Sequence, residues 1–252
     1  MIPLEMKDTV RYLGLLIDSN LTWKSHVDYI SLKISRLVGI IAKLRHYVPK
    51  YTLQKVYHGL MHPYLTYGIS IWGQAHKTIL NPLLVLQKRV IRLINYANYR
   101  DHVIPFFIDS KISPLNFLYF YNTACLMHDI INNNSPLNIA DLFTEISDVH
   151  NYNTRSAARK NLYQPQTRLN ISYKSFSSIG VKVCNNLSPS IRSLSKSLFK
   201  KKCTKHLLME SLLSCDDYVE VAFVERNNWY CFDILTFTFS INYVISTSTC
   251  LS

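Results

Sequence analysis

The sequence predicts a mainly α-helical fold with a short β-strand or hairpin near the N-terminus. Apolar residues recur at intervals of three and four along several long segments, which is the spacing of one helix face. Proline and asparagine stand where such segments would begin or end. The 252 residues are 48% hydrophobic and include only six glycines. This composition favours a packed core over flexible linkers.

The first expected element is a strand at Val10–Ile17. The longest apolar stripe follows it and ends at Pro49, which cannot continue a helix because it lacks the backbone N–H. A helix is therefore expected to end there. Its apolar stripe consists of Val27, Ile30, Ile34, Leu37, Ile41, Leu44 and Val48.

A second helix is expected from Thr52 to about His62, and Pro63 would start or kink the next one. Asn81 followed by Pro82 is typical of an N-cap and a first helical residue. We therefore expect a helix to begin there and to continue to about Asn95. Its apolar stripe would be Leu83, Leu86, Val90 and Leu93.

Ser113 and Pro114 repeat this start pattern, so a helix rich in aromatics is expected from Leu115 to about Ile131. Between Asp148 and Lys174 the apolar residues show no clear period, which predicts a long loop in which tyrosines and basic residues interleave. Two shorter helices are expected after it, at Phe176–Leu187 and Ser195–Ser214.

The basic residues are concentrated in two segments. The chain has 28 Lys and Arg against 16 Asp and Glu, a formal net charge of +12. Tyr29–Arg100 contains eleven basic residues and no acidic one, and His150–His206 contains twelve and none. Such one-sided charge is typical of proteins that bind polyanions, because neutralising phosphates releases condensed counterions. Nucleic acid is therefore the expected partner, and no small-molecule substrate is indicated.

Other site types are not supported by the residue spacing. The six cysteines form no Cys-x-x-Cys pair, so neither a disulfide framework nor a zinc knuckle is expected. His58 and His62 lie four apart without an accompanying Glu or third ligand, so zinc hydrolase chemistry is not expected. The N-terminus has no apolar run of the secretory kind. These features predict an intracellular protein, either nuclear or cytoplasmic.

Several ordered blocks along the chain form a recognisable series. The first is Arg11–Asp18, with Trp23 and His26 beyond it. The others are His62–Gly68, Trp72–Gly73, Leu86–Arg89, Arg92–Leu93, His150–Arg155 and Ser175–Gly180. This series resembles reverse transcriptases of non-LTR retrotransposons, in particular jockey-like elements, over roughly Val10 to Leu213. The first block is similar to the stretch that follows the catalytic palm, and the others resemble the region after the polymerase domain.

The resemblance implies an RNA-directed DNA polymerase that holds two Mg²⁺ ions with palm aspartates, including a Phe/Tyr-Ala-Asp-Asp motif before the Tyr-Leu-Gly block. Only Glu5 and Asp8 precede Tyr12 here, and neither sits in such a motif. Two-metal phosphoryl transfer needs carboxylates that converge on both ions. We therefore expect a truncated, catalytically inactive chain without a cofactor of its own, unless a palm is supplied in trans. Cys184 stands where the family usually has Trp, so weaker packing is expected around it.

The resemblance also implies a division of the chain into parts. Residues 1–20 would be a remnant of the palm-edge hairpin, 21–147 a helical thumb-like region, 148–215 a basic loop with C-terminal helices, and 216–252 an atypical apolar tail. The thumb helix would lie along a template–primer duplex and contact phosphates. The residues expected to contact RNA or DNA are Tyr12, Gly14, Lys33, Arg36, Lys43, Arg45, Lys88, Arg89, Arg92, Tyr152, Arg155, Arg159 and Lys160.

Each expectation has a plainer alternative. The basic helix face could simply be solvated, the hairpin could be an edge strand with a turn, and the basic loop could pack its tyrosines on the domain. The chain could also be an inert retroelement relic. A third hypothesis is a membrane-attached basic protein, motivated by the apolar segment Trp229–Ser252. Asp233 and Asn242 would be costly in a bilayer, so a membrane role is not favoured.

Overall fold

The computed structural model describes residues 7–213 except 133, 151, 153 and 165. The expectations for the segment 214–252, including the membrane hypothesis that rests on it, lie outside these residues. The described elements all belong to one unit, Met1–Cys215. They are mainly helical with one β-hairpin, as the sequence predicts. None of the described helices combines the length and the apolar composition needed to cross a membrane.

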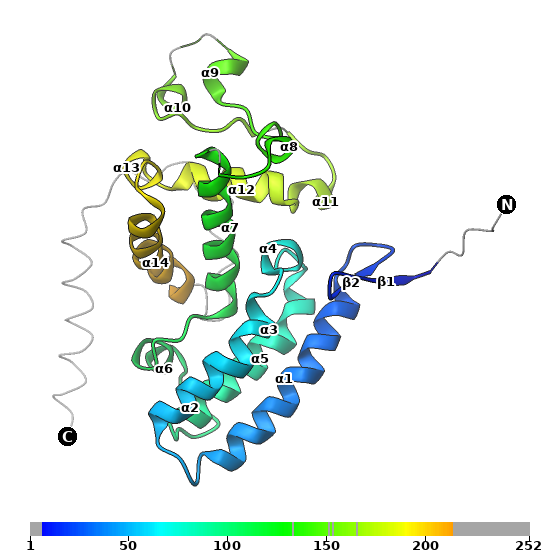
Figure 1. Cartoon of the computed structure of the whole chain (residues 1–252), viewed down its shortest axis with the longest axis vertical. Helices are drawn as coiled ribbons and strands as arrows, with labels where there is room; N and C mark the ends of the chain where they lie inside the picture. Colours follow the sequence, from blue (N-terminus) through cyan, green and yellow to red (C-terminus); the bar gives the residue numbers. More distant parts are fainter. Residues whose placement is uncertain (1–6, 133, 151, 153, 165, 214–252) are drawn as a thin grey trace. The chain divides into compact units, whose positions relative to one another are not determined.

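Figure 1 labels the elements in chain order. They are β1 (Thr9–Tyr12), β2 (Leu15–Asp18), α1 (Lys24–Leu44), α2 (Lys50–Val56), the π-helical turn η1 (Tyr57–Met61), α3 (His62–Thr66), α4 (Ile69–Trp72), α5 (Lys77–Ile94), α6 (Ile104–Asp109), α7 (Leu115–Ile131), α8 (Leu137–Ala140), α9 (Ile146–Val149), α10 (Arg155–Ala158), α11 (Asn170–Tyr173), α12 (Phe176–Asn186), α13 (Pro189–Arg192) and α14 (Lys196–Leu213).

The predicted N-terminal strand is an antiparallel hairpin of β1 and β2. Its two turn residues, Leu13 and Gly14, both have positive φ, at 45° and 83°. This is the combination of a type I′ turn, whose twist matches that of the two strands. Glycine adopts this conformation without the steric cost that other residues incur. The turn therefore explains why position 14 is a glycine.

Three contacts join the hairpin to the helices. The Asp18 carboxylate accepts hydrogen bonds from the backbone N–H groups of Thr22 and Trp23, both at 2.8 Å, just before α1 begins. The backbone N–H of Leu16 donates to Nδ1 of His26 at 3.3 Å. The Tyr67 hydroxyl donates to the carbonyl of Leu13. Desolvation opposes ionisation of Asp18, but the hydrogen bonds outweigh it and lower the pKa of this carboxyl.

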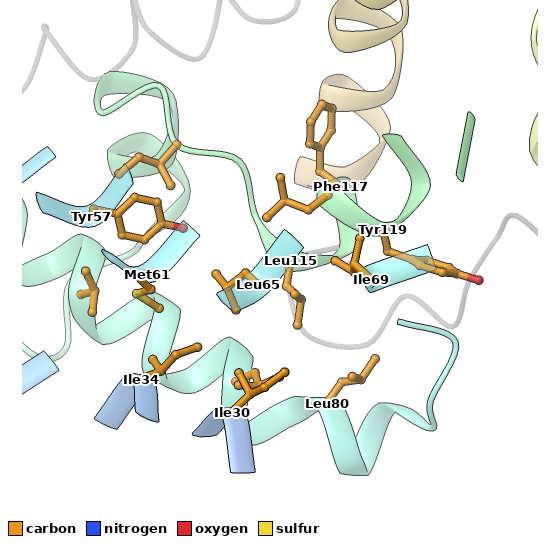
Figure 2. Close-up of a cluster of buried hydrophobic side chains, with 14 of the residues drawn as sticks. Ile30, Ile34, Tyr57, Met61, Leu65, Ile69, Leu80, Leu115, Phe117 and Tyr119 are labelled. Atoms are coloured by element: carbon orange, nitrogen blue, oxygen red, sulfur yellow. The ribbon is translucent and has the colours of Figure 1, made fainter. Parts of the chain in front are cut away.

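The core lies on one side of α1 and α5. The stripe predicted for α1 is confirmed at Val27, Ile30, Ile34 and Ile41, which are buried, while Leu37 and Leu44 are half-buried and Val38 is buried in addition. The predicted end at Pro49 is wrong: α1 ends at Leu44, where a tighter turn follows with the Tyr47 N–H donating to the Leu44 carbonyl at 2.9 Å, so Val48 lies outside the helix. Figure 2 shows Ile30 and Ile34 beside Leu65, Met61 and Tyr57, with Leu115 and Phe117 contributed from α7. Segments distant in sequence therefore share one core.

The helix predicted at Thr52–His62 consists of α2 and the π-helical turn η1. The helix predicted after Pro63 is divided into α3 and α4. The division occurs because Tyr67 is extended and Gly68 has a φ of 62°. The Trp72 indole N–H donates to the Tyr67 carbonyl at 2.8 Å and so supplies that break with a hydrogen-bond partner. The sequence showed apolar spacing on both sides of Gly68 but not the left-handed backbone between them.

The start predicted for α5 at Asn81 and Pro82 is wrong. The helix begins at Lys77, and the His76 side chain caps it by accepting from the backbone N–H of Thr78 at 3.4 Å. Pro82 consequently lies inside the helix, where its missing N–H leaves the carbonyl four residues earlier without its helical partner. A histidine cap is uncommon, so the familiar Asn-Pro pattern suggested the wrong residue.

Gln87 is a buried polar side chain that connects three elements. Its amide nitrogen donates to the Tyr57 hydroxyl and to the Ser113 carbonyl, both at 2.9 Å. Its amide oxygen accepts from the backbone N–H of Leu115, also at 2.9 Å. The helix predicted from Leu115 to Ile131 is confirmed, but Pro114 rather than Ser113 occupies the N-cap position. Gln87 therefore satisfies the first N–H of α7 in place of a local cap.

Two glycines allow α7 to pack closely. A Cβ atom on Gly73 would overlap the Tyr119 ring and come within 2.5 Å of the Ile69 carbonyl oxygen. A Cβ atom on Gly180 would lie 2.6 Å from Sδ of Met127. The helices predicted at Phe176–Leu187 and Ser195–Ser214 are confirmed as α12 and α14, and both pack on α7.

We expect Gly73→Ala to lower the free energy of unfolding by about 1–3 kcal/mol, because the added methyl group overpacks this contact. Gly39→Ala is the matched control, since no atom lies within 4 Å of a Cβ atom built on Gly39 inside α1. The control should gain about 0.5–1 kcal/mol from helix propensity. Urea unfolding followed by circular dichroism measures both changes. Equal stability of the two variants would contradict the packing argument.

Candidate nucleic-acid interface

The helices α1 and α5 run side by side in the same direction (Figure 1). A shallow open groove lies between their first halves, with Leu32 of α1 and Val85 of α5 among the side chains that line it. Both side chains are more than half exposed. The groove therefore marks a solvent-facing side of the helix pair, away from the core.

Cations extend this side toward the C-terminal ends of both helices. Arg36 stands one helical turn after Leu32, and Arg89 one turn after Val85, so each continues the row of the residue before it. Lys43 stands two turns after Arg36, about 10 Å further along the axis. All three cations are exposed, and no carboxylate among the described residues lies within ion-pair distance of them. We call Arg36, Lys43 and Arg89 the outer basic face.

The other cations predicted on these helices are half-buried, and two of them lie against tyrosine rings. Lys33 is half-buried with its ammonium 5.5 Å from the centre of the Tyr29 ring. Arg45 lies 5.5 Å from the Tyr96 ring. Lys88 is half-buried on the flank of α5. The structure therefore separates the cations predicted for α1 and α5 into an exposed set and a partly packed set.

Arg92 is the clearest case of a cation with a local partner. Its Nε donates to the Asp101 carbonyl at 3.0 Å, and its guanidinium lies 5.8 Å from the Tyr99 ring. The side chain is half-buried and closes the turn after α5. We infer that Arg92 acts primarily in folding this turn.

An exposed group of tyrosines that the sequence analysis did not single out lies where α1 and α5 end. The Tyr96 hydroxyl donates to the Val48 carbonyl at 3.0 Å and joins the two ends. Lys55 lies 4.2 Å from the centre of the Tyr51 ring. We call this group the tyrosine cluster. It consists of Tyr47, Tyr51, Tyr96 and Tyr99. The available sequence signal was the spacing of four between Tyr51 and Lys55. The pairs Arg45–Tyr96 and Arg92–Tyr99 have no such spacing.

The predicted loop between Asp148 and Lys174 contains two short helices, α10 and α11, rather than irregular chain throughout. The Thr154 hydroxyl caps α10 by accepting from the backbone N–H of Ala157 at 3.2 Å. Tyr152, Arg155, Arg159 and Lys160 are exposed, as a binding role requires. Figure 1 shows α10 far from α2, so this loop and the tyrosine cluster are separate surfaces.

Two side chains outside this loop hold its basic part in place. The Arg192 guanidinium donates to the carbonyls of Arg159 at 2.7 Å and Lys160 at 2.9 Å. The Asn185 amide exchanges two 2.9 Å hydrogen bonds with the backbone of Leu162, as a neighbouring strand would. The positions of Arg159 and Lys160 therefore depend on α12 and α13, which sequence spacing alone did not indicate.

Cys184 lies beneath this loop and is buried. It packs with Met127, Ile130 and Val181, and the adjoining cavity has a volume of only about 10 Å³. Burial raises the pKa of the Cys184 thiol, although the nearby Arg192 guanidinium lowers it in part. The structure accommodates the small side chain with little empty space at this position.

The hairpin tip presents the last two predicted residues. Tyr12 is exposed. A Cβ atom added to Gly14 would lie 3.5 Å from the Tyr67 ring. The positive φ of the turn therefore explains the glycine, whereas the Tyr67 ring would leave room for a Cβ atom. A nucleic-acid contact at Tyr12 and Gly14 stays a prediction.

The histidine pair considered as metal ligands spans η1 and α3. The rings of His58 and His62 are 5.6 Å apart, centre to centre. Burial lowers the pKa of His62, and so does the nearby His58. Among residues 7–213 with their four gaps, no three His, Cys, Asp or Glu side chains are grouped as a metal site would require.

Comparison with known proteins gives partial matches to mobile-element polymerases. The chain is 31% identical over 91 residues to the RNA-directed DNA polymerase from mobile element jockey of Drosophila melanogaster, which covers 34% of this chain and 10% of the relative. It is 30% identical over 91 residues to the corresponding Drosophila funebris protein, with the same coverage. It is 29% identical over 96 residues to the probable polymerase from transposon X-element of Drosophila melanogaster, covering 37% and 11%.

The chain therefore spans about a tenth of the length of the curated relatives it matches. No family model matches it, and no solved structure matches it.

We expect Arg192→Ala to loosen the basic loop, because two carbonyls would lose charge-assisted hydrogen bonds. Limited trypsin digestion measures this as faster cleavage after Arg159 and Lys160, with the products identified by mass spectrometry. Lys182→Ala is the control, since it removes a cation from α12 that lies over the Tyr173 ring instead. Unchanged cleavage in Arg192→Ala would show that other contacts hold the loop.

Proposed function

The matched part of this chain is related to the jockey-like RNA-directed DNA polymerases of non-LTR retrotransposons, and on that basis we propose that the chain binds a template–primer duplex without reading its base sequence. The outer basic face carries this proposal. Its three exposed cations project from two rigid, parallel helices, and the segment Tyr29–Arg100 around them contains no acidic residue. Contacts to phosphates position a duplex but do not distinguish bases.

The arrangement suits phosphates for a physical reason. Arg36, Lys43 and Arg89 lie opposite the buried stripes of their helices, so they reach solvent without displacing core residues. Because both helices are packed, the backbone that carries these cations needs no ordering when they bind. A duplex offers a dense row of negative charges along its axis. The two helices can therefore follow a nucleic-acid backbone over more than one helical turn of α1.

The basic loop supplies a second contact region in this proposal. Arg155, Arg159 and Lys160 are exposed, and Arg192 holds the backbone of the last two. Tyr152 is exposed beside them and could stack on an unpaired base. The exposure of these side chains supports such a role, and the plainer alternative of a solvated loop predicts no change in binding when they are replaced.

We expect the combined replacement of Arg36, Lys43 and Arg89 by Ala to weaken duplex binding and to make its salt dependence less steep. Each lost phosphate contact should reduce the slope of log affinity against log salt by about 0.9. Fluorescence anisotropy with a labelled RNA–DNA duplex across a salt series measures both quantities.

The control removes the same formal charge at three other exposed lysines, Lys77, Lys111 and Lys201. Equal losses in both triple variants would mean that net charge alone drives binding. No binding of the folded, unsubstituted chain at low salt would overturn the proposal and favour the hypothesis of an inert relic.

We further propose that these 252 residues alone do not extend a primer. The sequence before Tyr12 contains Glu5 and Asp8 but no Phe/Tyr-Ala-Asp-Asp motif of the kind that holds Mg²⁺ in the family it resembles. A primer-extension assay with Mg²⁺ and all four deoxynucleotides tests this directly. Nucleotide addition that survives repurification of the chain would contradict it, whereas addition only after mixing with a polymerase palm would indicate complementation in trans.

A further inference from the structure

We propose that the tyrosine cluster binds unpaired nucleotides of single-stranded nucleic acid by stacking their bases on Tyr47 and Tyr99. This inference rests on the proposed function in that nucleic acid is the partner of both surfaces. It adds a second site with a different substrate, since the outer basic face takes duplex phosphates and the cluster takes bases that are not paired.

The exposure of the rings is the first observation. Tyr47 is 86% exposed and Tyr99 is 81% exposed, which are the highest values among the large apolar side chains of the described residues. Tyrosine usually covers most of its ring with other side chains, because the ring is largely apolar. Two rings left open at the same end of a helix pair form a surface that a planar partner can cover.

The cations beside the rings are the second observation. Lys55 lies over Tyr51 at 4.2 Å, Arg45 over Tyr96 at 5.5 Å and Arg92 over Tyr99 at 5.8 Å, each measured to the ring centre. A cation on one face of a ring leaves the other face available. Surfaces that bind single strands combine such rings for the bases with cations for the phosphates.

Nearby acidic groups already have partners. Asp101 accepts a hydrogen bond from the backbone N–H of Asn98 at 2.7 Å, and Asp109 forms an ion pair with Lys50. These are the two acidic residues of the chain between Asn95 and Ser113. The Lys50 ammonium therefore offsets the charge of Asp109, and Asp101 is held in place by the backbone.

The cluster is also fixed in shape. The Tyr96 hydroxyl bonds to the Val48 carbonyl, so the turn after α1 and the turn after α5 are joined. Tyr47 lies in the turn after α1 and Tyr99 lies in the segment after α5, and this hydrogen bond ties the two segments together. Little ordering is needed before a base can stack, which favours binding.

Paired bases do not offer this contact, because their faces are covered by neighbouring base pairs. The partner that fits is thus an unpaired segment, with either ribose or deoxyribose. Continuity with the outer basic face supports this choice, since Lys43 precedes Tyr47 by four residues. A duplex lying along α1 would direct a single-stranded overhang toward the cluster.

The test compares three labelled probes by fluorescence anisotropy with the full chain. They are a blunt duplex, the same duplex carrying an oligothymidylate overhang, and the free oligothymidylate. The unsubstituted chain should bind the overhang probe more tightly than the blunt one. Tyr47→Ala and Tyr99→Ala should each weaken binding of the overhang probe roughly tenfold. Binding of the blunt duplex should stay unchanged.

The controls separate stacking from other effects. Tyr47→Phe and Tyr99→Phe should retain binding because the ring remains. Tyr64→Ala should also retain it, since Tyr64 is an exposed tyrosine of α3 outside the cluster. An oligothymidylate containing 5-iodouracil should form photochemical adducts at Tyr47 or Tyr99, detected by mass spectrometry.

The outcomes distinguish this inference from the proposed function. Equal affinity for blunt and overhang probes, or adducts confined to residues outside the cluster, would overturn the inference and leave duplex binding intact. Tyrosine-dependent binding of the free oligothymidylate without any duplex binding would overturn the proposed function and keep the tyrosine site. Loss of binding in the Phe variants would rule out stacking as the cause.

Discussion

The burial of one apolar side of α1 against α5 and the short helices α2–α4 is the constraint on which the rest of the structure depends. Val27, Ile34 and Ile41 are almost fully buried along that side. Because a helix turns by a fixed angle per residue, burying these positions fixes where all the others point. Arg36 and Lys43 are thereby directed to solvent. The basic surface is a consequence of packing the core.

Polar side chains then set how the remaining elements join this pair. The buried Gln87 uses its amide nitrogen and oxygen on three partners and connects α5, η1 and the start of α7. The half-buried side chains of Arg192 and Asn185 hold the basic loop by bonding to its backbone. Buried backbone groups without partners destabilise a fold, so these side chains act where no regular ladder is available.

Several blocks that resemble the polymerase family have structural roles here. In the block His62–Gly68, Leu65 is buried, Tyr67 bonds to the hairpin and Gly68 takes the left-handed conformation that ends α3. Gly73 allows close contact with Tyr119. The Leu86–Arg89 block contains both the buried Gln87 and the exposed Arg89. Adjacent residues of one block thus divide between holding the fold and facing solvent.

The cations of the outer basic face, and Tyr47 and Tyr99 of the tyrosine cluster, have no such structural role. Their exposure is what a binding function requires and what folding alone does not. The Tyr96 hydroxyl bonds to the Val48 carbonyl and so joins the segments that follow α1 and α5. In our proposal, the outer basic face contacts a duplex and the tyrosine cluster contacts a single strand.

The sequence by itself determined the helical class, the buried stripe of α1, the extent of α7 and the segregation of charge, because each depends on local spacing or on composition. It also indicated Arg36, Lys43 and Arg89, whose exposure follows from helical periodicity. Tertiary structure alone decided that Arg45 lies over the Tyr96 ring, that Gln87 bonds to the first N–H of α7, and that Arg192 holds the basic loop. These outcomes depend on contacts between residues distant in sequence, as with Tyr96 and Val48, and no local pattern encodes which segments will meet.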